Sequence, residues 1–441
     1  MVKLPVFKEH LMKENISKLT KSKFVRNVAI MATGTAGAQI IGMALSPIIT
    51  RLYGPEAYGI MGVFNSIINI VAPVAALTYP IAIVLPKSDF NAKGIIRLSL
   101  LIAGFISVIS LVLISLFKDQ IVQIFNLKEV SSFLYLIPIV IIFAGLMQVT
   151  EQWLIRTKQF SINARVTFWQ SVIINGSKAG VGLIYPFASV LVVLTVMANG
   201  LRAAMMIFFA KKSTYIENNL IKERKKNTKE LAKKYYDFPM YRAPEVFLNA
   251  ISNGLPVLML TSFFGAAAAG FYTIGRTVLS LPTQLIGKAV GDVFYPRIAE
   301  AAKREEDVTN LIKKSTFALA GIGILPFGLV ILFGPALFSF VFGPEWVVAG
   351  EYARWIALWS YFGFMNRPSV HSLPVLKAQR FHLIYTIIML ITRIGVLAIG
   401  YIVFSSDIIA VALFGIVGAI LNFGLITITI KISNKKNYDL K

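Results

Sequence analysis

Apolar runs of about 20 residues, separated by short polar breaks, fill nearly the whole sequence. An α-helix rises about 1.5 Å per residue, so a run of this length crosses the hydrocarbon core of a bilayer. The pattern predicts about twelve membrane-spanning helices. They cover residues 26–50, 58–85, 95–117, 132–154, 163–184, 188–210, 245–264, 268–296, 312–337, 349–372, 381–402 and 407–430. The predicted fold class is therefore an all-α polytopic membrane protein.

Composition agrees with this interpretation and narrows the chemistry. Hydrophobic residues make up 56% of the 441 residues and charged residues only 15%, whereas soluble proteins carry about 25% charged residues. The chain has no cysteine and three histidines, too few and too scattered to hold a metal cluster. We expect no disulfide, no metal site and no cofactor.

The basic residues follow the predicted topology. The net charge is +23, which in a soluble protein indicates nucleic-acid binding. With the N-terminus placed in the cytoplasm, about 34 of the 44 Lys and Arg fall in inner segments. The outer loops hold Arg51, Lys118 and Lys128. This asymmetry predicts cytoplasmic N- and C-termini and no nucleic-acid partner.

The longest polar break, at 211–238, separates six predicted helices from six others. We expect a solvated cytoplasmic linker there, since runs of like charge remain hydrated. The predicted organisation is a basic cytoplasmic N-terminal segment (1–24), an N-lobe (25–210), a basic cytoplasmic linker (211–243), a C-lobe (244–431) and a basic cytoplasmic tail (432–441).

The two halves repeat the same local patterns in the same order. Gly54 and Gly59 in "YGPEAYG" correspond to Gly265 and Gly270 in "FGAAAAG". Further along, "RTKQF" (156–160) resembles "KAQRF" (377–381). Each half holds an even number of helices, so the copies have one orientation. We expect two pseudo-symmetric six-helix lobes around a central cavity.

Cations interrupt several predicted spans, at a cost of about 2.5–3.5 kcal/mol each near the centre of the bilayer. Lys178-x-Gly180 and Arg393-x-Gly395 occupy matching places in the two halves. A cation at such a place faces a water-filled cavity or pairs within the bundle, and for these two residues the sequence leaves both alternatives open. The seven cations inside predicted spans are Lys178, Arg202, Arg276, Lys288, Arg354, Arg367 and Arg393.

Polar side chains also recur at helical spacing. Asn249 and Asn253 share a face, as do Asn65 and Asn69, and Lys288 lies one turn before Asp292. These amides either line a cavity or join helices through hydrogen bonds. Five prolines are expected to interrupt the first two helices of each half, namely Pro47, Pro73, Pro80, Pro256 and Pro282.

Four segments resemble a known family. They are "SPIITRLYGPEAYGIMGVFNSI", "YDFPMYRAPEVFLNAISNGLPVLML", "AGFYTIGRTVLSLP" and "FGPEWVVAGEYARWIALW". Together they are similar to the polysaccharide transporter (O-antigen or capsule flippase, Wzx-type) family of the MOP superfamily, which also contains the MATE drug exporters and the lipid II flippases.

The resemblance implies a function in the bacterial cytoplasmic membrane. Similar proteins carry undecaprenyl-diphosphate-linked oligosaccharides between leaflets by alternating access, so the expected partners are that lipid, the bilayer and polysaccharide polymerase machinery. The cavity is expected between the first two helices of each lobe. That places Gln39, Asn65, Asn69, Asn249, Asn253, Arg276 and Lys288 in the substrate site, with Lys178 and Arg393 as further candidates. Coupling to a proton or sodium gradient is implied, through Asp292 or Glu151.

Two other functions are alternatives for a helical membrane protein of this kind. A MATE-like exporter of cationic compounds would need carboxylates in its cavity, whereas the candidates here are mostly cations. A membrane-embedded polysaccharide enzyme usually has a long outer loop, and the predicted outer loops are short. The electrostatic sign of the cavity distinguishes these functions from the flippase.

Overall fold

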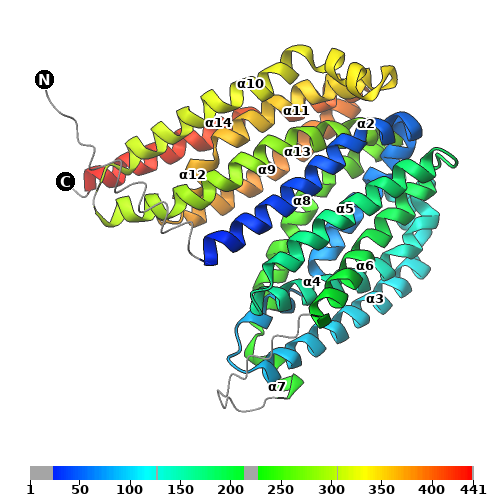
Figure 1. Cartoon of the computed structure of the whole chain (residues 1–441). Helices are drawn as coiled ribbons and strands as arrows, with labels where there is room; N and C mark the ends of the chain where they lie inside the picture. Colours follow the sequence, from blue (N-terminus) through cyan, green and yellow to red (C-terminus); the bar gives the residue numbers. More distant parts are fainter. Residues whose placement is uncertain (1–22, 126–127, 213–226, 305, 440–441) are drawn as a thin grey trace, which may run out of the picture.

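The computed structural model describes residues 23–125, 128–212, 227–304 and 306–439, and these residues are almost entirely helical (Figure 1). No strand occurs within those ranges. Lipid offers no hydrogen-bond partner to a backbone N–H or C=O group, and an α-helix satisfies these groups within one segment. The predicted all-α fold is confirmed.

The helices form two lobes. The N-lobe contains α2 (Lys23–Val71), α3 (Asp89–Phe125), α4 (Ile137–Arg156), α5 (Phe160–Gly182) and α6 (Ala188–Lys212). The C-lobe contains α8 (Ala243–Phe264), α9 (Ala266–Lys303), α10 (Val308–Phe342), α11 (Val347–Met365), α12 (Arg367–Ser372), α13 (Gln379–Ile402) and α14 (Asp407–Asp439). Within the described residues, eight helical stretches are long and apolar enough to cross a membrane, with both halves of α2 counted as one.

Helix α2 is two helices joined by a kink, and the kink reveals the duplication. Gly54 has φ 68° and ψ 174°, and Gly265, which joins α8 to α9, has φ 89° and ψ 178°. Side chains disfavour positive φ, so glycine serves at both junctions. The same conformation at the same place in each lobe confirms the predicted pseudo-symmetry. With α2 counted twice, each predicted span has its helix.

The predicted helix over 58–85 ends early. The α-helix stops at Val71, and two 3₁₀ turns follow, η1 (Ala72–Val74) and η2 (Tyr79–Val84). Each turn has a proline at its start, and Leu77 and Thr78 between them have positive φ. Proline lacks the N–H that would continue the helical hydrogen bonds, so the chain turns instead.

The expected interruptions at other prolines are wrong. Pro47 lies inside α2, Pro256 inside α8, and α9 is continuous through Pro282. At the far end, α14 continues to Asp439, into the segment expected to be a tail. The described part of the linker contains α7 (Thr228–Lys234) and the π-turn η4 (Phe238–Arg242).

The linker packs against the N-lobe. Leu231 of α7 is buried in a cluster with Tyr79 and Ile95. The Tyr79 hydroxyl donates to the carbonyl of Ala232 at 3.1 Å, and the Thr78 hydroxyl donates to the carbonyl of Phe238 at 3.0 Å. The segment leading into α8 is therefore held by the N-lobe, although α8 belongs to the C-lobe.

The lobes meet at one end and diverge at the other. In Figure 1 they converge at the upper right, near the kink of α2, and separate toward the lower left, where α2 begins and α14 ends. At the convergent end a Cβ on Gly59 would clash with the carbonyl oxygen of Ala266, and a Cβ on Gly270 would clash with that of Pro55. These duplicated glycines let α2 and α9 cross backbone to backbone.

Two further contacts close the convergent end. Arg51 of α2 donates to the carbonyls of Phe340 and Val341 in the last turn of α10, at 2.9 and 3.2 Å. Unpaired carbonyls at a helix C-terminus attract a cation. The ring of Tyr58 meets that of Trp346 edge to face, with centroids 5.5 Å apart. Opening this end requires all of these contacts to break.

Substitution of Gly59 by alanine should destabilise the protein, because the added methyl group forces α2 away from α9. Such overpacking costs about 1–3 kcal/mol. Gly104→Ala in α3 is the matched control, since nothing lies within 4 Å of a Cβ there. Thermal unfolding of the purified variants in detergent should show a lower midpoint for Gly59→Ala alone. Equal midpoints would contradict the crossing described here.

Loss of the Arg51 bonds should favour separation of the lobes at the convergent end. Partly exposed bonds from a charged donor are worth about 1 kcal/mol, so Arg51→Ala should raise the separated population about fivefold. The protein contains no cysteine, which allows spin labels at Glu56→Cys and Val347→Cys and a measurement of their separation. Lys118→Ala, a cation at the same end that stacks on Tyr135 within its own lobe, is the control. An unchanged distance distribution in Arg51→Ala would show that these bonds do not hold the lobes.

Candidate functional site

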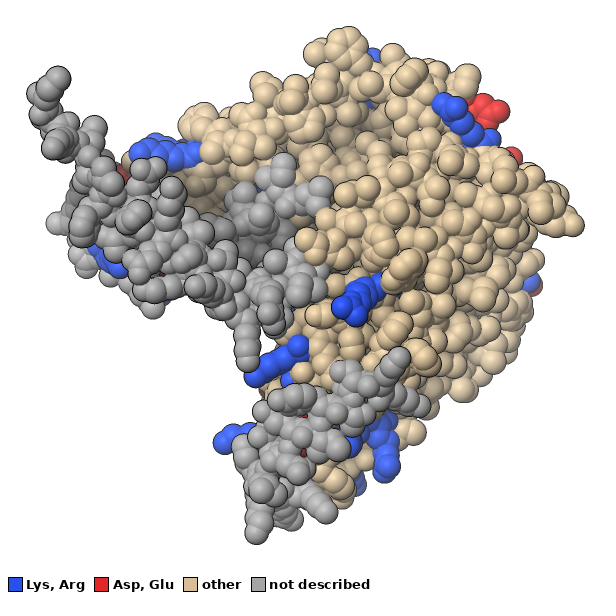
Figure 2. Space-filling model, in the orientation of Figure 1, with Lys and Arg blue, Asp and Glu red and all other residues tan. Residues whose placement is uncertain are grey.

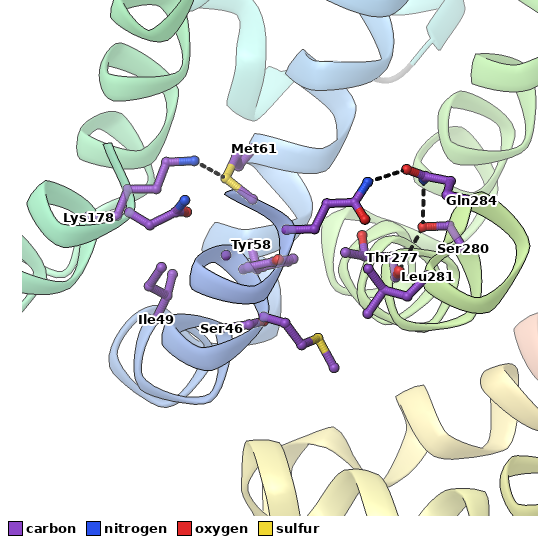
Figure 3. A pocket seen from close by; sticks show the side chains of 13 residues that line it. Ser46, Ile49, Tyr58, Met61, Lys178, Thr277, Ser280, Leu281 and Gln284 are labelled. Carbon is purple, nitrogen blue, oxygen red and sulfur yellow. Dashed lines mark hydrogen bonds between the residues drawn. The ribbon is translucent and has the colours of Figure 1, made fainter. Parts of the chain in front are cut away.

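Two cavities contain candidate site residues. The larger one lies between the lobes and has a volume of about 260 Å³. We call it the interlobe pocket. Helices α2 and α5 form one side and α9 the other (Figure 3). Its lining is rich in amides and hydroxyls, with one cation. The lining residues are Gln39, Gly42, Met43, Ser46, Ile49, Tyr58, Met61, Asn175, Lys178, Thr277, Ser280, Leu281 and Gln284.

Lys178 enters the interlobe pocket from α5 and points toward Met61 of α2 (Figure 3). Its Nζ lies 3.5 Å from the Met61 sulfur, a weak acceptor. Its backbone carbonyl accepts a hydrogen bond of 2.9 Å from Tyr53. The sequence left open whether this lysine faces a cavity or pairs within the bundle. In the structure its side chain lines a cavity and forms no ion pair with any described residue.

A hydrogen bond across the interlobe pocket joins the lobes. Gln39 Nε2 donates to Gln284 Oε1 at 2.6 Å, and Gln284 Nε2 donates to the hydroxyl of Ser280 at 3.1 Å. Gln39 Oε1 is buried without a partner among the described residues. A buried acceptor without a hydrogen bond is unfavourable, so this oxygen is available to a ligand donor or water.

The second cavity, of about 150 Å³, lies within the C-lobe, and we call it the C-lobe pocket. It is formed by α8 and α13, with Phe414 of α14 at its wall. Asn249 and Asn253 of α8 face Arg393 of α13 across it. The full lining is Asn249, Ser252, Asn253, Leu255, Pro256, Thr386, Met389, Leu390, Arg393, Ile394, Leu397 and Phe414.

Aromatic rings hold the Arg393 side chain. Its guanidinium carbon lies 4.0 Å from the ring centroid of Trp359 and 4.1 Å from that of Phe414. Such contacts contribute about 2 kcal/mol when desolvated. Stacking uses the faces of the guanidinium and leaves the N–H groups at its edge, and Arg393 Nε is buried without an acceptor in the described part of the chain. The group is thus oriented but not neutralised.

A second guanidinium lies next to the C-lobe pocket. Arg276 of α9 donates to the carbonyl of Asn253 at 2.5 Å and to its side-chain oxygen at 3.0 Å. Arg276 and Arg393 are close enough to repel each other electrostatically. Among the described residues, no carboxylate lines either pocket. Two adjacent like charges, with no carboxylate in the described linings, favour an anion nearby.

Four of the predicted site residues are not in the described lining of either pocket. Asn65 is half-buried and Asn69 exposed on α2, and neither belongs to the lining of the two pockets. The structure therefore does not bring them together with Lys178 or Arg393. The side chains of Lys288 and Asp292 lie outside the described residues.

Glu151 lies in α4 and lines neither pocket. Its Oε1 is 3.5 Å from an Arg202 nitrogen of α6 and accepts a hydrogen bond of 3.1 Å from Asn163 of α5. Asn163 also accepts a bond of 3.2 Å from Arg202. Arg354, another cation predicted inside a span, pairs with Glu351 at 3.3 Å. These charges are neutralised within their own lobes.

Two of the bounding helices correspond between the pockets, although one pocket lies between the lobes and the other within the C-lobe. Each is bounded by the first helix of its lobe (the first half of α2, or α8) and by the helix that carries the matched cation (α5 with Lys178, or α13 with Arg393). Helical spacing and charge did not predict the other lining residues Met61, Phe414 and Gln284, nor the stacking of Trp359 on Arg393. Ser280 and Gln284 lie one turn apart on α9, so helical spacing could have predicted that they share a face. No local sequence pattern predicts the aromatic rings that stack on Arg393.

A comparison of the sequence with protein families gives one match. The profile of a family described as polysaccharide biosynthesis protein matches residues 48–351. The chain belongs to this family. Among curated proteins, none matches the sequence.

Solved structures show that this family member has the fold of MOP superfamily transporters. The inward closed form of the lipid II flippase MurJ matches with TM-score 0.71 and 15% identity, over 91% of this chain and 87% of that chain. An inward-facing multidrug resistance MATE transporter matches with TM-score 0.68 and 13% identity, over 91% and 95%. An outward-facing one gives 0.57 and 14%, over 93% and 96%.

The paired arginines predict that this polysaccharide biosynthesis protein binds pyrophosphate. Trp359, stacked on Arg393, should report binding through its fluorescence. Arg276→Gln and Arg393→Gln should each weaken binding at least about tenfold, because a charge-assisted hydrogen bond is worth about 1.5–3 kcal/mol. Arg304→Gln is the control, since Arg304 is exposed and pairs with Glu300 at 2.7 Å. An equal loss in the control would show that binding is non-specific.

Proposed function

We propose that this protein is a flippase that moves undecaprenyl-diphosphate-linked oligosaccharide repeat units across the bacterial cytoplasmic membrane, for O-antigen, capsule or exopolysaccharide synthesis. The observation that carries the proposal is the C-lobe pocket with Arg276 beside Arg393 and no described carboxylate in its lining. The family and the MOP fold support transport linked to polysaccharide synthesis.

The chemistry of a diphosphate suits this pocket. A diphosphate brings several negative charges in a small volume, and arginine binds such oxygens through two parallel N–H bonds. In a low-dielectric environment the gain from neutralising two adjacent cations is larger than in water. The stacked Arg393 needs little reorganisation to bind, because its rings already fix its orientation.

The arrangement of the lobes supports alternating access. The lobes are joined at the convergent end and separate at the divergent end, where most of the lysines and arginines of the described residues lie (Figures 1 and 2). Basic residues favour the cytoplasmic side. We therefore place the divergent end and both termini in the cytoplasm, so that this structure is open toward the inner leaflet. Rocking of the lobes about the glycine crossing would open the opposite end.

An ion gradient supplies the energy in this proposal, with proton or sodium as the coupling ion. Asp292 and Glu151 are the candidate carboxylates. Glu151 is held by Arg202 and Asn163, so an ion that uses it must compete with that pair. Lys288, on the same helix as Arg276, is retained as a substrate-site candidate. A polysaccharide polymerase would receive the cargo on the outer side.

The pocket linings argue against the two other functions. An exporter of cationic compounds needs negative charge at its site, and the described linings contain cations instead. A polysaccharide-forming enzyme of the paired-carboxylate type needs two acids facing one site. Glu151 and Glu245 do not meet at either pocket, since Glu245 pairs with Arg242 at 2.9 Å.

A complementation experiment tests this function. In the host deleted for this gene, the double variant Arg276→Gln, Arg393→Gln should fail to restore surface polysaccharide, because the cargo diphosphate loses both guanidinium groups. Lipid extracts should then contain accumulated lipid-linked repeat units. Arg304→Gln at equal membrane abundance should restore polysaccharide fully. Normal polysaccharide in the double variant, or no accumulated lipid-linked sugar in the deletion strain, would contradict the proposal.

A further inference from the structure

Lys178 remains without a counter-charge after the diphosphate has been assigned to Arg276 and Arg393. Its ammonium group carries three donors, and among the described residues its one hydrogen-bond partner is the thioether of Met61, at 3.5 Å. No described carboxylate lines the interlobe pocket. A cation left unpaired inside a membrane protein is costly, which indicates that a ligand completes this pocket.

The interlobe pocket is distinct from the C-lobe pocket. The two linings share no residue: one is formed by α2, α5 and α9, and the other by α8, α13 and α14. Arg276 and Arg393, beside the C-lobe pocket, are close enough for their charges to interact. A cargo that places its diphosphate at the arginines can therefore present a different chemical group to Lys178.

Among the described residues, the interlobe pocket contains an unpaired hydrogen-bond acceptor as well as an unpaired cation, so its ligand needs a donor and a negative charge. Gln39 Oε1 is buried and lacks a hydrogen-bond donor among the described residues. A diphosphate at neutral pH offers acceptors only, so it would satisfy Lys178 and leave this oxygen unpaired. A sugar offers hydroxyl donors, and Asn175, Ser280 and Gln284 on the same walls can bond to further hydroxyls.

A lysine is also better suited than an arginine to bind a single carboxylate on a sugar. An ammonium is a compact point charge on a flexible stem, whereas the arginine fork matches phosphates and carboxylates in fixed bidentate geometry. Lys178 can reach a single carboxylate placed among hydroxyls without imposing one orientation on the ring. Figure 3 shows its amine on the α5 side of the pocket, opposite Ser280 and Gln284 of α9.

We propose that the interlobe pocket binds a sugar that carries a carboxylate, with Lys178 pairing with the carboxylate and Gln39 accepting from a hydroxyl, so that this pocket sets the sugar specificity of transport. The inference rests on the proposed function, because the sugar is part of the lipid-linked cargo. Since Gln39 and Gln284 come from different lobes, a bound sugar would also replace or reinforce the hydrogen bond that joins them.

The test uses purified full-length protein with D-glucuronate and its neutral methyl ester as matched probes. Binding is measured by saturation-transfer NMR, with a titration of pyrophosphate on the same samples. Wild type should bind glucuronate about tenfold more tightly than the ester, as expected for one charge-assisted contact. Lys178→Gln should remove this preference and Lys178→Arg should retain most of it. Gln39→Ala should weaken binding of both probes to a similar degree.

The pyrophosphate titration separates this inference from the proposed function. Lys178→Gln should leave pyrophosphate affinity unchanged within about twofold, whereas Arg393→Gln should weaken it and keep the preference for glucuronate. Equal binding of the two probes to wild type, or an unchanged preference in Lys178→Gln, overturns the inference alone. An equal loss of pyrophosphate binding in Lys178→Gln and Arg393→Gln also overturns it, by assigning Lys178 to the diphosphate. Absence of Arg393-dependent pyrophosphate binding instead counts against the proposed function.

Discussion

Positive charge inside a low-dielectric bundle must be neutralised, and the way in which each cation meets this constraint organises the structure. Arg202 pairs with Glu151, and Arg354 pairs with Glu351, so both stabilise single lobes. Arg51 finds carbonyls of the opposite lobe and closes one end of the molecule. Arg393 has aromatic faces and Arg276 a neutral amide, neither of which cancels its charge. Among the described residues, Lys178, Arg276 and Arg393 beside the two pockets have no carboxylate partner, which supports the proposal of an anionic cargo.

The internal duplication gives the two lobes the same helix arrangement, but their pockets differ. Gly54 and Gly265 adopt one backbone conformation, and Gly59 and Gly270 make the crossing of the lobes. In this arrangement, position 178 opens to the opposite lobe, whereas Arg393 is enclosed by the aromatic rings of its own lobe. The interlobe pocket therefore has walls from both lobes, whereas the lining of the C-lobe pocket comes from α8, α13 and α14. A cargo held at both would couple its binding to the state of the interface.

The sequence predicted features that repeat, and missed those that depend on packing between distant segments. Apolar runs and the duplicated glycines predicted the helices and the lobes, because each is local. The predicted helix over 58–85 was too long, because the chain turns at Leu77 and Thr78 between the two 3₁₀ turns whose second residues are Pro73 and Pro80, and the linker adds a hydrogen bond to Thr78 there.

At the site, Asn249 and Asn253, one turn apart, both line the C-lobe pocket, whereas Asn65 and Asn69, predicted from the same spacing, lie outside both linings. Spacing defines a face of a helix, and tertiary packing decides what that face meets. Trp359 stacks on a guanidinium 34 positions away in the sequence, and no local pattern shows such a contact.

The most direct test of the central claim is a transport measurement in liposomes that contain only the purified protein. Undecaprenyl-diphosphate-linked saccharide with a fluorophore on the sugar is placed in both leaflets, and a membrane-impermeant quencher is added outside. Wild-type protein should make the inner pool accessible, and the rate should fall at least about tenfold in the double variant Arg276→Gln, Arg393→Gln, because the diphosphate loses both arginines. Flipping at the wild-type rate by that variant would contradict the claim that uncompensated arginines carry the cargo.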